Sequence, residues 1–170
     1  MKKIIFSVVV LLMLSGCSVS ALPKTADISE AYKKDFFAVA TASYGEETTK
    51  MEITKNGMSI SFLLCEPEEL SGMSIVIFDE HAKVTYEGMT QDIDADKLPD
   101  SAPFLLLEEL FDDLSNPDEF VLSTAEGEII AQGDDFAATF SLEDYSLKNA
   151  VFPRFNTEFV FERFEFSEEK

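Results

Sequence analysis

The chain has 170 residues, of which 13 are lysine or arginine and 33 are aspartate or glutamate, so its formal net charge is −20. A chain of this length usually forms one domain with a real hydrophobic core, and its hydrophobic fraction of 46% excludes general disorder. The negative charge excludes nucleic acid as a partner, because contacts with phosphates need clusters of lysine and arginine.

A short apolar segment follows two lysines at the N-terminus. Lys2 and Lys3 form a basic region, and residues 4–14 are apolar except for Ser7. A membrane-spanning helix needs about 20 apolar residues, so this segment is too short to span and is typical of a signal peptide. We therefore expect residues 1–16 to be removed, which takes away both lysines and changes the net charge from −20 to −22.

The apolar segment ends in the run Leu-Ser-Gly-Cys at residues 14–17. This run resembles the bacterial lipobox, whose cysteine receives a diacylglycerol on its thiol and becomes the first mature residue. The resemblance implies lipid attachment at Cys17 and an anchor in the outer face of the cell membrane. The alternative is an ordinary secretory signal with an incidental cysteine. Residues 17–29 are then the lipidated N-terminus and a short polar tether.

Apolar and polar residues alternate along most of the remaining chain, as they do in strands with one buried face. In residues 50–55, Met51 and Ile53 share one face, and Asn56-Gly57 then predicts a tight hairpin turn. Short loops between such segments favour an antiparallel meander. The pattern predicts ten or eleven strands, near residues 36–44, 50–55, 58–65, 73–77, 83–87, 89–93, 119–125, 128–132, 136–142, 145–152 and 157–166.

Residues 104–114 have helical periodicity instead. Pro103 suits the first turn of a helix, and Pro117 follows its end. The apolar residues of this segment cover a wider face of the helix than the usual apolar stripe does, so we expect the helix to be buried on most sides. A curled sheet could enclose it. The expected fold is mainly β with one central helix, in which an unclosed half-barrel wraps around that helix.

The order of these elements resembles the LolA/LolB-like lipoprotein carrier and receptor family. Four local phrases are also similar to small lipoproteins of clostridia-like Gram-positive bacteria. They are Pro-Glu-Glu-Leu-Ser-Gly-Met (67–73), Val-Thr-Tyr-Glu-Gly-Met (84–89), Lys-Leu-Pro-Asp-Ser (97–101) and Phe-Val-Phe-Glu-Arg-Phe (159–164). The resemblance covers residues 30–166, before an acidic tail at 167–170. It implies an unclosed barrel with helices across its mouth and an apolar cavity for acyl chains. Cys17 fits a stationary, receptor-like lipoprotein, because a soluble shuttle would not carry its own anchor.

We expect the concave face of the sheet and the helix to line that cavity. Near the C-terminus, Phe159 and Phe161 occupy odd-numbered positions and Phe164 and Phe166 even-numbered ones. In a regular strand the two pairs would therefore face opposite sides of the sheet, so a bulge near Glu162 is needed to turn all four inward. These aromatic side chains either pack a solid core or line part of a cavity. The residues expected to line the cavity are Phe62, Leu64, Met73, Ile75, Phe104, Leu107, Phe111, Phe140, Phe159 and Phe161.

The sequence contains no recognisable catalytic or metal-binding motif, so we expect no enzyme activity and no cofactor. Cys65 fits a strand as a small apolar residue, and the only histidine, His81, lies in an expected polar turn. Residues 92–96, Asp-Ile-Asp-Ala-Asp, begin like a calcium loop. Its sixth and twelfth positions hold Lys97 and Pro103 instead of glycine and glutamate, so we expect an exposed acidic loop.

Two functions are compatible with these features. The first is a membrane-anchored lipoprotein that binds a lipid or acyl chain between the helix and the sheet. The second is an envelope interaction or assembly lipoprotein with a solid core, whose acidic surface binds a basic envelope protein. A void of about 300–1,000 Å³ would favour the first, and a filled core would favour the second.

Overall fold

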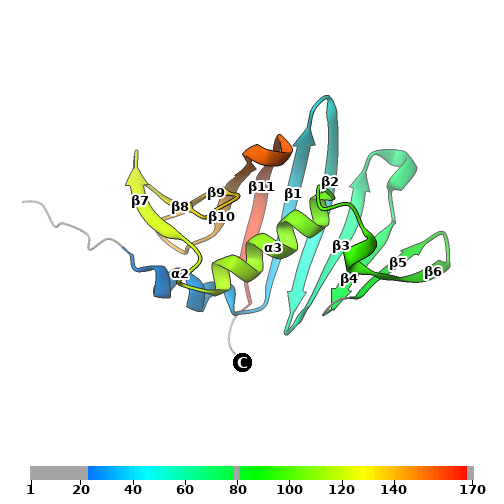
Figure 1. Cartoon of the computed structure of the whole chain (residues 1–170), viewed down its shortest axis with the longest axis horizontal. Helices are drawn as coiled ribbons and strands as arrows, with labels where there is room; N and C mark the ends of the chain where they lie inside the picture. Colours follow the sequence, from blue (N-terminus) through cyan, green and yellow to red (C-terminus); the bar gives the residue numbers. More distant parts are fainter. Residues whose placement is uncertain (1–22, 79–80, 168–170) are drawn as a thin grey trace, which may run out of the picture.

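The structure is a computed structural model that describes residues 23–78 and 81–167 (Figure 1). Within these residues, eleven strands form one antiparallel sheet that curls without closing, and two helices lie on the same side of it. An unclosed antiparallel sheet of ten or eleven strands was predicted from the alternation of apolar residues, and this prediction is confirmed. Within the described residues, neither helix is long and apolar enough to cross a membrane.

The elements follow the predicted segments within a few residues. The first six strands are β1 (Phe36–Tyr44), β2 (Glu47–Asn56), β3 (Ser59–Glu66), β4 (Ser74–Phe78), β5 (His81–Tyr86) and β6 (Met89–Asp94). After helix α3 (Pro103–Ser115) come β7 (Val121–Ala125), β8 (Glu128–Gln132), β9 (Ala137–Phe140), β10 (Leu147–Phe152) and β11 (Thr157–Phe166). Three short 3-10 turns lie at Glu68–Leu70, Ala95–Lys97 and Pro153–Phe155.

The strand order is β6-β5-β4-β3-β2-β1-β11-β10-β9-β8-β7. Successive strands pair within each half of the sheet, as the predicted meander requires. The first and last strands, β1 and β11, join the two halves at the centre. Helix α3 carries the chain from one open edge, β6, to the other, β7, and crosses the face of the sheet on the way (Figure 1).

The bulge expected near Glu162 is present in β11. Arg163 pairs with Val39 and Phe161 pairs with the next residue, Ala40, so Glu162 is the extra residue. The parity of β11 therefore changes at this point, and aromatic residues on both sides of the bulge turn inward. Three of them are at most 9% exposed: Phe159, Phe161 and Phe164.

A further helix, α2 (Thr25–Tyr32), lies where the sequence predicted a tether up to residue 29. Ile28 and Tyr32 lie one turn apart in it and are fully buried, so the packed part of the chain begins before residue 30. The helix has only eight residues, and this pair of apolar side chains is too little to show helical periodicity.

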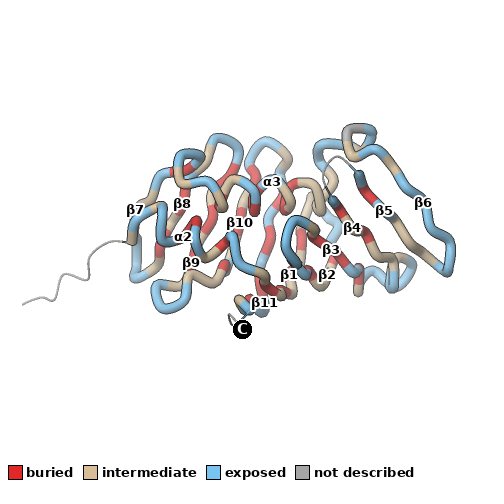
Figure 2. The backbone as a smooth tube through the Cα atoms, turned by 90° about the horizontal axis from the view of Figure 1, so that it is seen from below, coloured by how far each residue is buried: buried red, intermediate tan, exposed pale blue. Residues whose placement is uncertain are grey.

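Helix α3 buries one face and exposes another. Leu107 and Leu110 are fully buried, whereas Glu109 and Asp112 are exposed and Leu105 is only partly buried. The expectation of a helix buried on most sides is therefore not confirmed. The curled sheet covers α3 from one side only, and its other side faces solvent with acidic residues. Figure 2 shows the buried positions of the strands and helices gathered in the middle of the molecule.

Candidate functional site

The residues expected to line a cavity come together between α3 and the sheet. Met73 and Phe104 are partly buried there and pack against the hydrophobic core. The rings of Phe62 and Phe104 lie 6.3 Å apart between their centroids, so the helix fills the space in front of β3. Eight of the ten predicted residues are core residues, at most 9% exposed: Phe62, Leu64, Ile75, Leu107, Phe111, Phe140, Phe159 and Phe161.

An aromatic cluster fills the concave face beside the second half of α3, and it joins Phe111 and Phe164 to two residues that the sequence did not single out, Tyr32 and Phe36. Tyr32 of α2 lies at its centre. The centroid of its ring is 6.2 Å from that of Phe111, and Phe36 lies 4.7 Å from Phe111 and 4.8 Å from Phe164. Aromatic pairs at these separations contribute beyond their buried area. This part of the half-barrel therefore contains side chains rather than an empty cavity.

The hydroxyl of Tyr32 has a partner inside this cluster. It donates a hydrogen bond to the carbonyl oxygen of Tyr145 at 3.1 Å. Burial, together with the negative charge of Asp144, raises the pKa of Tyr32 well above its ordinary value. The hydroxyl therefore stays protonated and acts as a structural donor.

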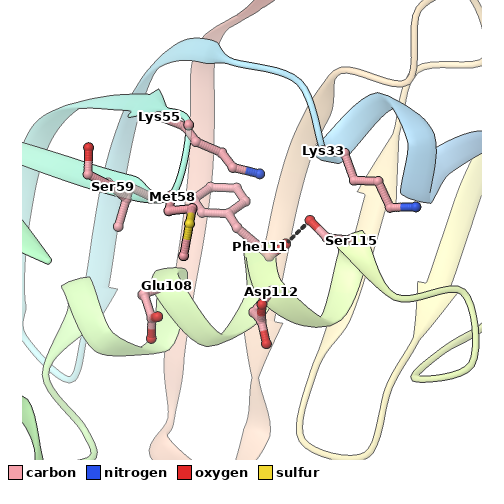
Figure 3. Close-up of a pocket in the computed structure, with 10 residues that line it drawn as sticks. Lys33, Lys55, Met58, Ser59, Glu108, Phe111, Asp112 and Ser115 are labelled. Carbon is pink, nitrogen blue, oxygen red and sulfur yellow. Dashed lines mark hydrogen bonds between the residues drawn. The ribbon is translucent and has the colours of Figure 1, made fainter. Parts of the chain in front are cut away.

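A hollow of about 420 Å³ opens to solvent where the β2–β3 turn, the end of α2 and the second half of α3 meet (Figure 3). We call it the mouth pocket. Of the ten residues predicted for the cavity, only Phe111 lines it. The pocket is lined by Lys33, Lys55, Gly57, Met58, Ser59, Ile60, Glu108, Phe111, Asp112 and Ser115.

The apolar part of the mouth pocket continues the hydrophobic core to the surface. Phe111 and Ile60 are 3% and 6% exposed and belong to the core. Met58, in contrast, is 79% exposed, and Figure 3 shows its side chain in the hollow near Phe111. A ligand in the mouth pocket would therefore contact both core side chains and an apolar side chain that is otherwise in water.

The polar part of the mouth pocket centres on Lys55. Its Nζ donates a hydrogen bond to the carbonyl oxygen of Tyr32 at the end of α2. Partial burial lowers the pKa of Lys55, against the opposite effect of the carboxylates of Asp35 and Asp112. Asp35 also accepts a hydrogen bond from the backbone N–H of Gly57 at 2.8 Å, which ties the β2–β3 turn to the segment after α2.

The solvent side of α3 carries the acidic residues. Burial, followed by the charges of Asp112 and Glu109, raises the pKa of Glu108. Burial also raises the pKa of Asp113 to about 6, with further contributions led by Glu109 and Glu119. A second hollow of about 420 Å³ lies on this side, and we call it the acidic hollow. It is lined by five carboxylates, one arginine and two apolar residues: Asp100, Glu108, Glu109, Asp112, Asp135, Arg154, Leu105 and Phe155.

The other residues singled out from the sequence do not form a reactive site. Cys65 lies near the end of β3, whereas His81 begins β5 and pairs with Phe78, which pairs with the opposite end of β3. Asp92 and Asp94 lie in strand β6 rather than in the expected loop. Within residues 23–78 and 81–167, no group of three or more His, Cys, Asp and Glu side chains could hold a metal ion.

Some predictions lie outside the described residues. They are the signal peptide at residues 1–16, lipid attachment at Cys17 and most of the acidic tail at 167–170. These remain predictions from the sequence.

No protein-family model matches the sequence, and no curated protein is significantly similar to it. Among solved structures, an uncharacterized conserved protein from Thermus thermophilus has a TM-score of 0.53 at 10% identity, over 84% of this chain and 85% of that chain. A LolA superfamily protein from Nitrosomonas europaea has a TM-score of 0.43 at 8% identity, over 87% and 96% of the two chains. The lipoprotein LppX of Mycobacterium tuberculosis has a TM-score of 0.46 at 6% identity, over 85% of this chain and 93% of that chain.

At these identities, such similarities concern the fold and not the function. The detailed resemblance to clostridial lipoproteins stays a prediction. The architecture itself is the one that the resemblance implied, because eleven antiparallel strands curl without closing and helices lie across their concave side. The chain therefore has a LolA-like fold.

Proposed function

We propose that the protein is a membrane-anchored, non-enzymatic lipoprotein that binds the acyl chain of a lipid at the mouth of its half-barrel. The observation that carries this proposal is the mouth pocket, a hollow of about 420 Å³ whose floor is the core residue Phe111. An acyl chain in this hollow would remove Met58 from water. Each methylene buried against such a surface contributes about 0.8 kcal/mol.

The N-terminal sequence supports the membrane part of this proposal. Residues 14–17 resemble a lipobox, so Cys17 would carry the lipid anchor on the outer face of the cell membrane. Helix α2 begins at Thr25, only eight residues after Cys17. An anchored molecule would thus stay close to a membrane that can supply lipid.

Titration of the purified protein with a fluorescent fatty acid tests acyl binding. We expect saturable binding to the wild type. Met58→Asp should weaken it by about tenfold or more, because the substitution places a charge beside the chain. Met89→Asp is the matched control, since Met89 is similarly exposed (68%) but lies on edge strand β6, outside the mouth pocket.

Two outcomes would contradict the proposal. Absence of saturable binding by the wild type would exclude an acyl-binding function for this protein. Equal loss of binding in the Met58 and Met89 variants would place the acyl chain somewhere other than the mouth pocket.

The packing of the core favours a second candidate, an interaction or assembly lipoprotein. Eight of the residues expected to line the cavity are at most 9% exposed and belong to the hydrophobic core. The acidic hollow, with five carboxylates around Arg154, would then bind a basic segment of an envelope protein. Native mass spectrometry separates the two candidates. Co-purified lipid supports the first, and a lipid-free protein that binds no acyl probe leaves only the second.

A further inference from the structure

Two of the few lysines of this acidic protein line the mouth pocket, across from the carboxylates of Glu108 and Asp112. Lys33 and Lys55 both line the hollow, although acidic residues outnumber basic ones 33 to 13 in the chain. Lys50 and Lys148 lie elsewhere on the sheet, and each of their ammonium groups contacts a glutamate, at 2.7 and 2.8 Å. The ammonium group of Lys55 instead donates to a neutral backbone carbonyl.

The setting of Lys55 differs from that of a surface lysine in two ways. Its side chain is partly buried, so its charge is less well hydrated, and Asp35 and Asp112 act on it only through space. Within residues 23–78 and 81–167 it forms no ion pair with a carboxylate. An ammonium group has three donors, and the hydrogen bond to Tyr32 uses one of them.

We propose that Lys55, assisted by Lys33, binds the anionic headgroup of a single-chain amphiphile whose acyl chain lies against Phe111 and Met58 in the mouth pocket. This inference rests on the proposed acyl-binding function and adds the chemical class of the ligand. The shared chemistry is a carboxylate or phosphate group at the end of one apolar chain. A charge-assisted hydrogen bond to such a group is stronger than one to a neutral headgroup.

The arrangement of charges in the pocket gives the ligand one orientation. Figure 3 shows Lys33 and Lys55 on the side of α2 and β2, whereas Glu108 and Asp112 project from α3 on the other side. An anionic headgroup is attracted by the two lysines and repelled by these two carboxylates, and Asp35, which acts on Lys55 through space, weakens the attraction. Lys33 already contacts Glu30 at 2.6 Å and its side chain is 52% exposed, so its contribution should be smaller than that of Lys55.

Displacement of a fluorescent fatty acid from the purified protein tests the headgroup site. The competitors are dodecanoate, dodecyl phosphate and the neutral dodecanol, which share one chain length, and inorganic phosphate alone. We expect both anionic amphiphiles to displace the probe at concentrations about tenfold lower than dodecanol does. Comparison of the carboxylate with the phosphate then identifies the preferred headgroup.

The variants separate the headgroup site from the apolar pocket. Lys55→Met keeps most of the apolar stem and should abolish the preference for anionic competitors. The probe is itself anionic and should bind this variant more weakly, so the inhibition constants are corrected for the affinity of the probe, and the corrected constant of dodecanol should change little. Lys33→Met, at an exposed position that should tolerate substitution, should reduce the same preference to a smaller extent. Lys148→Met is the control, because it removes one positive charge from strand β10, outside the mouth pocket.

The outcomes distinguish this inference from the function on which it rests. Equal displacement by dodecanoate and dodecanol in the wild type would overturn the headgroup site and leave acyl binding intact. An anionic preference that Lys148→Met reduces as much as Lys55→Met would also overturn it, because the effect would then follow from net charge. A probe that does not bind at all would overturn both proposals. Displacement by inorganic phosphate alone would support an anion site at the lysines that does not depend on the chain.

Discussion

Asp113 lies near the C-terminal end of α3, where a negative charge interacts unfavourably with the helix dipole. Partial burial and the neighbouring carboxylates led by Glu109 add to this cost and raise the pKa of Asp113 to about 6. The folded state therefore binds a proton more readily than the unfolded chain, in which the pKa stays near 3.8. By linkage, the unfavourable contribution of Asp113 to the stability of the fold is fully present above pH 6 and is lost as the pH falls toward 4.

We predict that Asp113→Asn stabilises the protein at pH 7.5 and has little effect on stability near pH 4. After allowance for solvent screening at this partly exposed site, the gain should be about 1 kcal/mol, or about 2–4 °C in Tm. Thermal melts of both proteins between pH 4 and 8 measure it. Asp92→Asn on β6 is the control, because it removes the same charge from an exposed strand far from α3. A gain that does not depend on pH would contradict the assigned cause.

The sequence alone could not show that Lys33 and Lys55 line one pocket. Lys33, Lys55 and Ser115 are separated by 22 and 60 positions, and no local pattern connects them. They meet because the end of α2 accepts a hydrogen bond from Lys55 and α3 lies against both. Phe111 was found in advance only because its helical spacing assigned it to the buried face.

At the scale of elements, α3 combines a buried apolar face with an exposed acidic face. We predict that Leu107→Asp unfolds the protein or lowers its Tm drastically, because Leu107 is fully buried and an unpaired carboxylate there costs several kcal/mol. Leu105→Asp is the matched control in the same helix. Leu105 is only partly buried and lines the acidic hollow, so this variant should remain folded with a modestly lower Tm.

Circular dichroism during thermal unfolding measures both effects. Equal losses of stability in the two variants would mean that the two faces of α3 do not differ as the structure shows. A folded Leu107→Asp protein with wild-type Tm would mean that α3 is not needed to hold the sheet together.

The elements themselves were well predicted because their patterns are local. Alternation marked most of the strands, and the change of parity between Phe161 and Phe164 required the bulge that Glu162 forms. The pairing of β1 with β11 was not predicted, since no local pattern records which distant strands meet. Helix α2 was missed for a different reason. Its two buried apolar residues, Ile28 and Tyr32, pack into the hydrophobic core, so the helix is stabilised by tertiary packing more than by helical propensity.

At the scale of the whole molecule, the net negative charge repels anionic lipids, whereas the two lysines of the mouth pocket attract an anionic group locally. A processed chain with a net charge of −22 is repelled by anionic phospholipid headgroups, so electrostatics alone would not hold it at a membrane. In the proposed headgroup site, the lysines of the mouth pocket lie opposite Glu108 and Asp112 and would select an anionic ligand without attracting the whole surface to the membrane. The proposed attachment to the membrane would therefore depend on the lipid anchor.

We predict that Cys17→Ser abolishes acylation and releases the protein from the membrane fraction, because serine cannot accept the thioether-linked diacylglycerol. The wild type should stay with the membrane in about 1 M salt, where charges are screened within about 3 Å, since two acyl chains hold it by hydrophobic transfer. Fractionation and labelling with a radioactive fatty acid measure both properties. Cys65→Ser, which changes the other cysteine, should leave them unchanged. If the Cys17 variant still labels and sediments like the wild type, the protein is held at the membrane by something other than a lipidated Cys17.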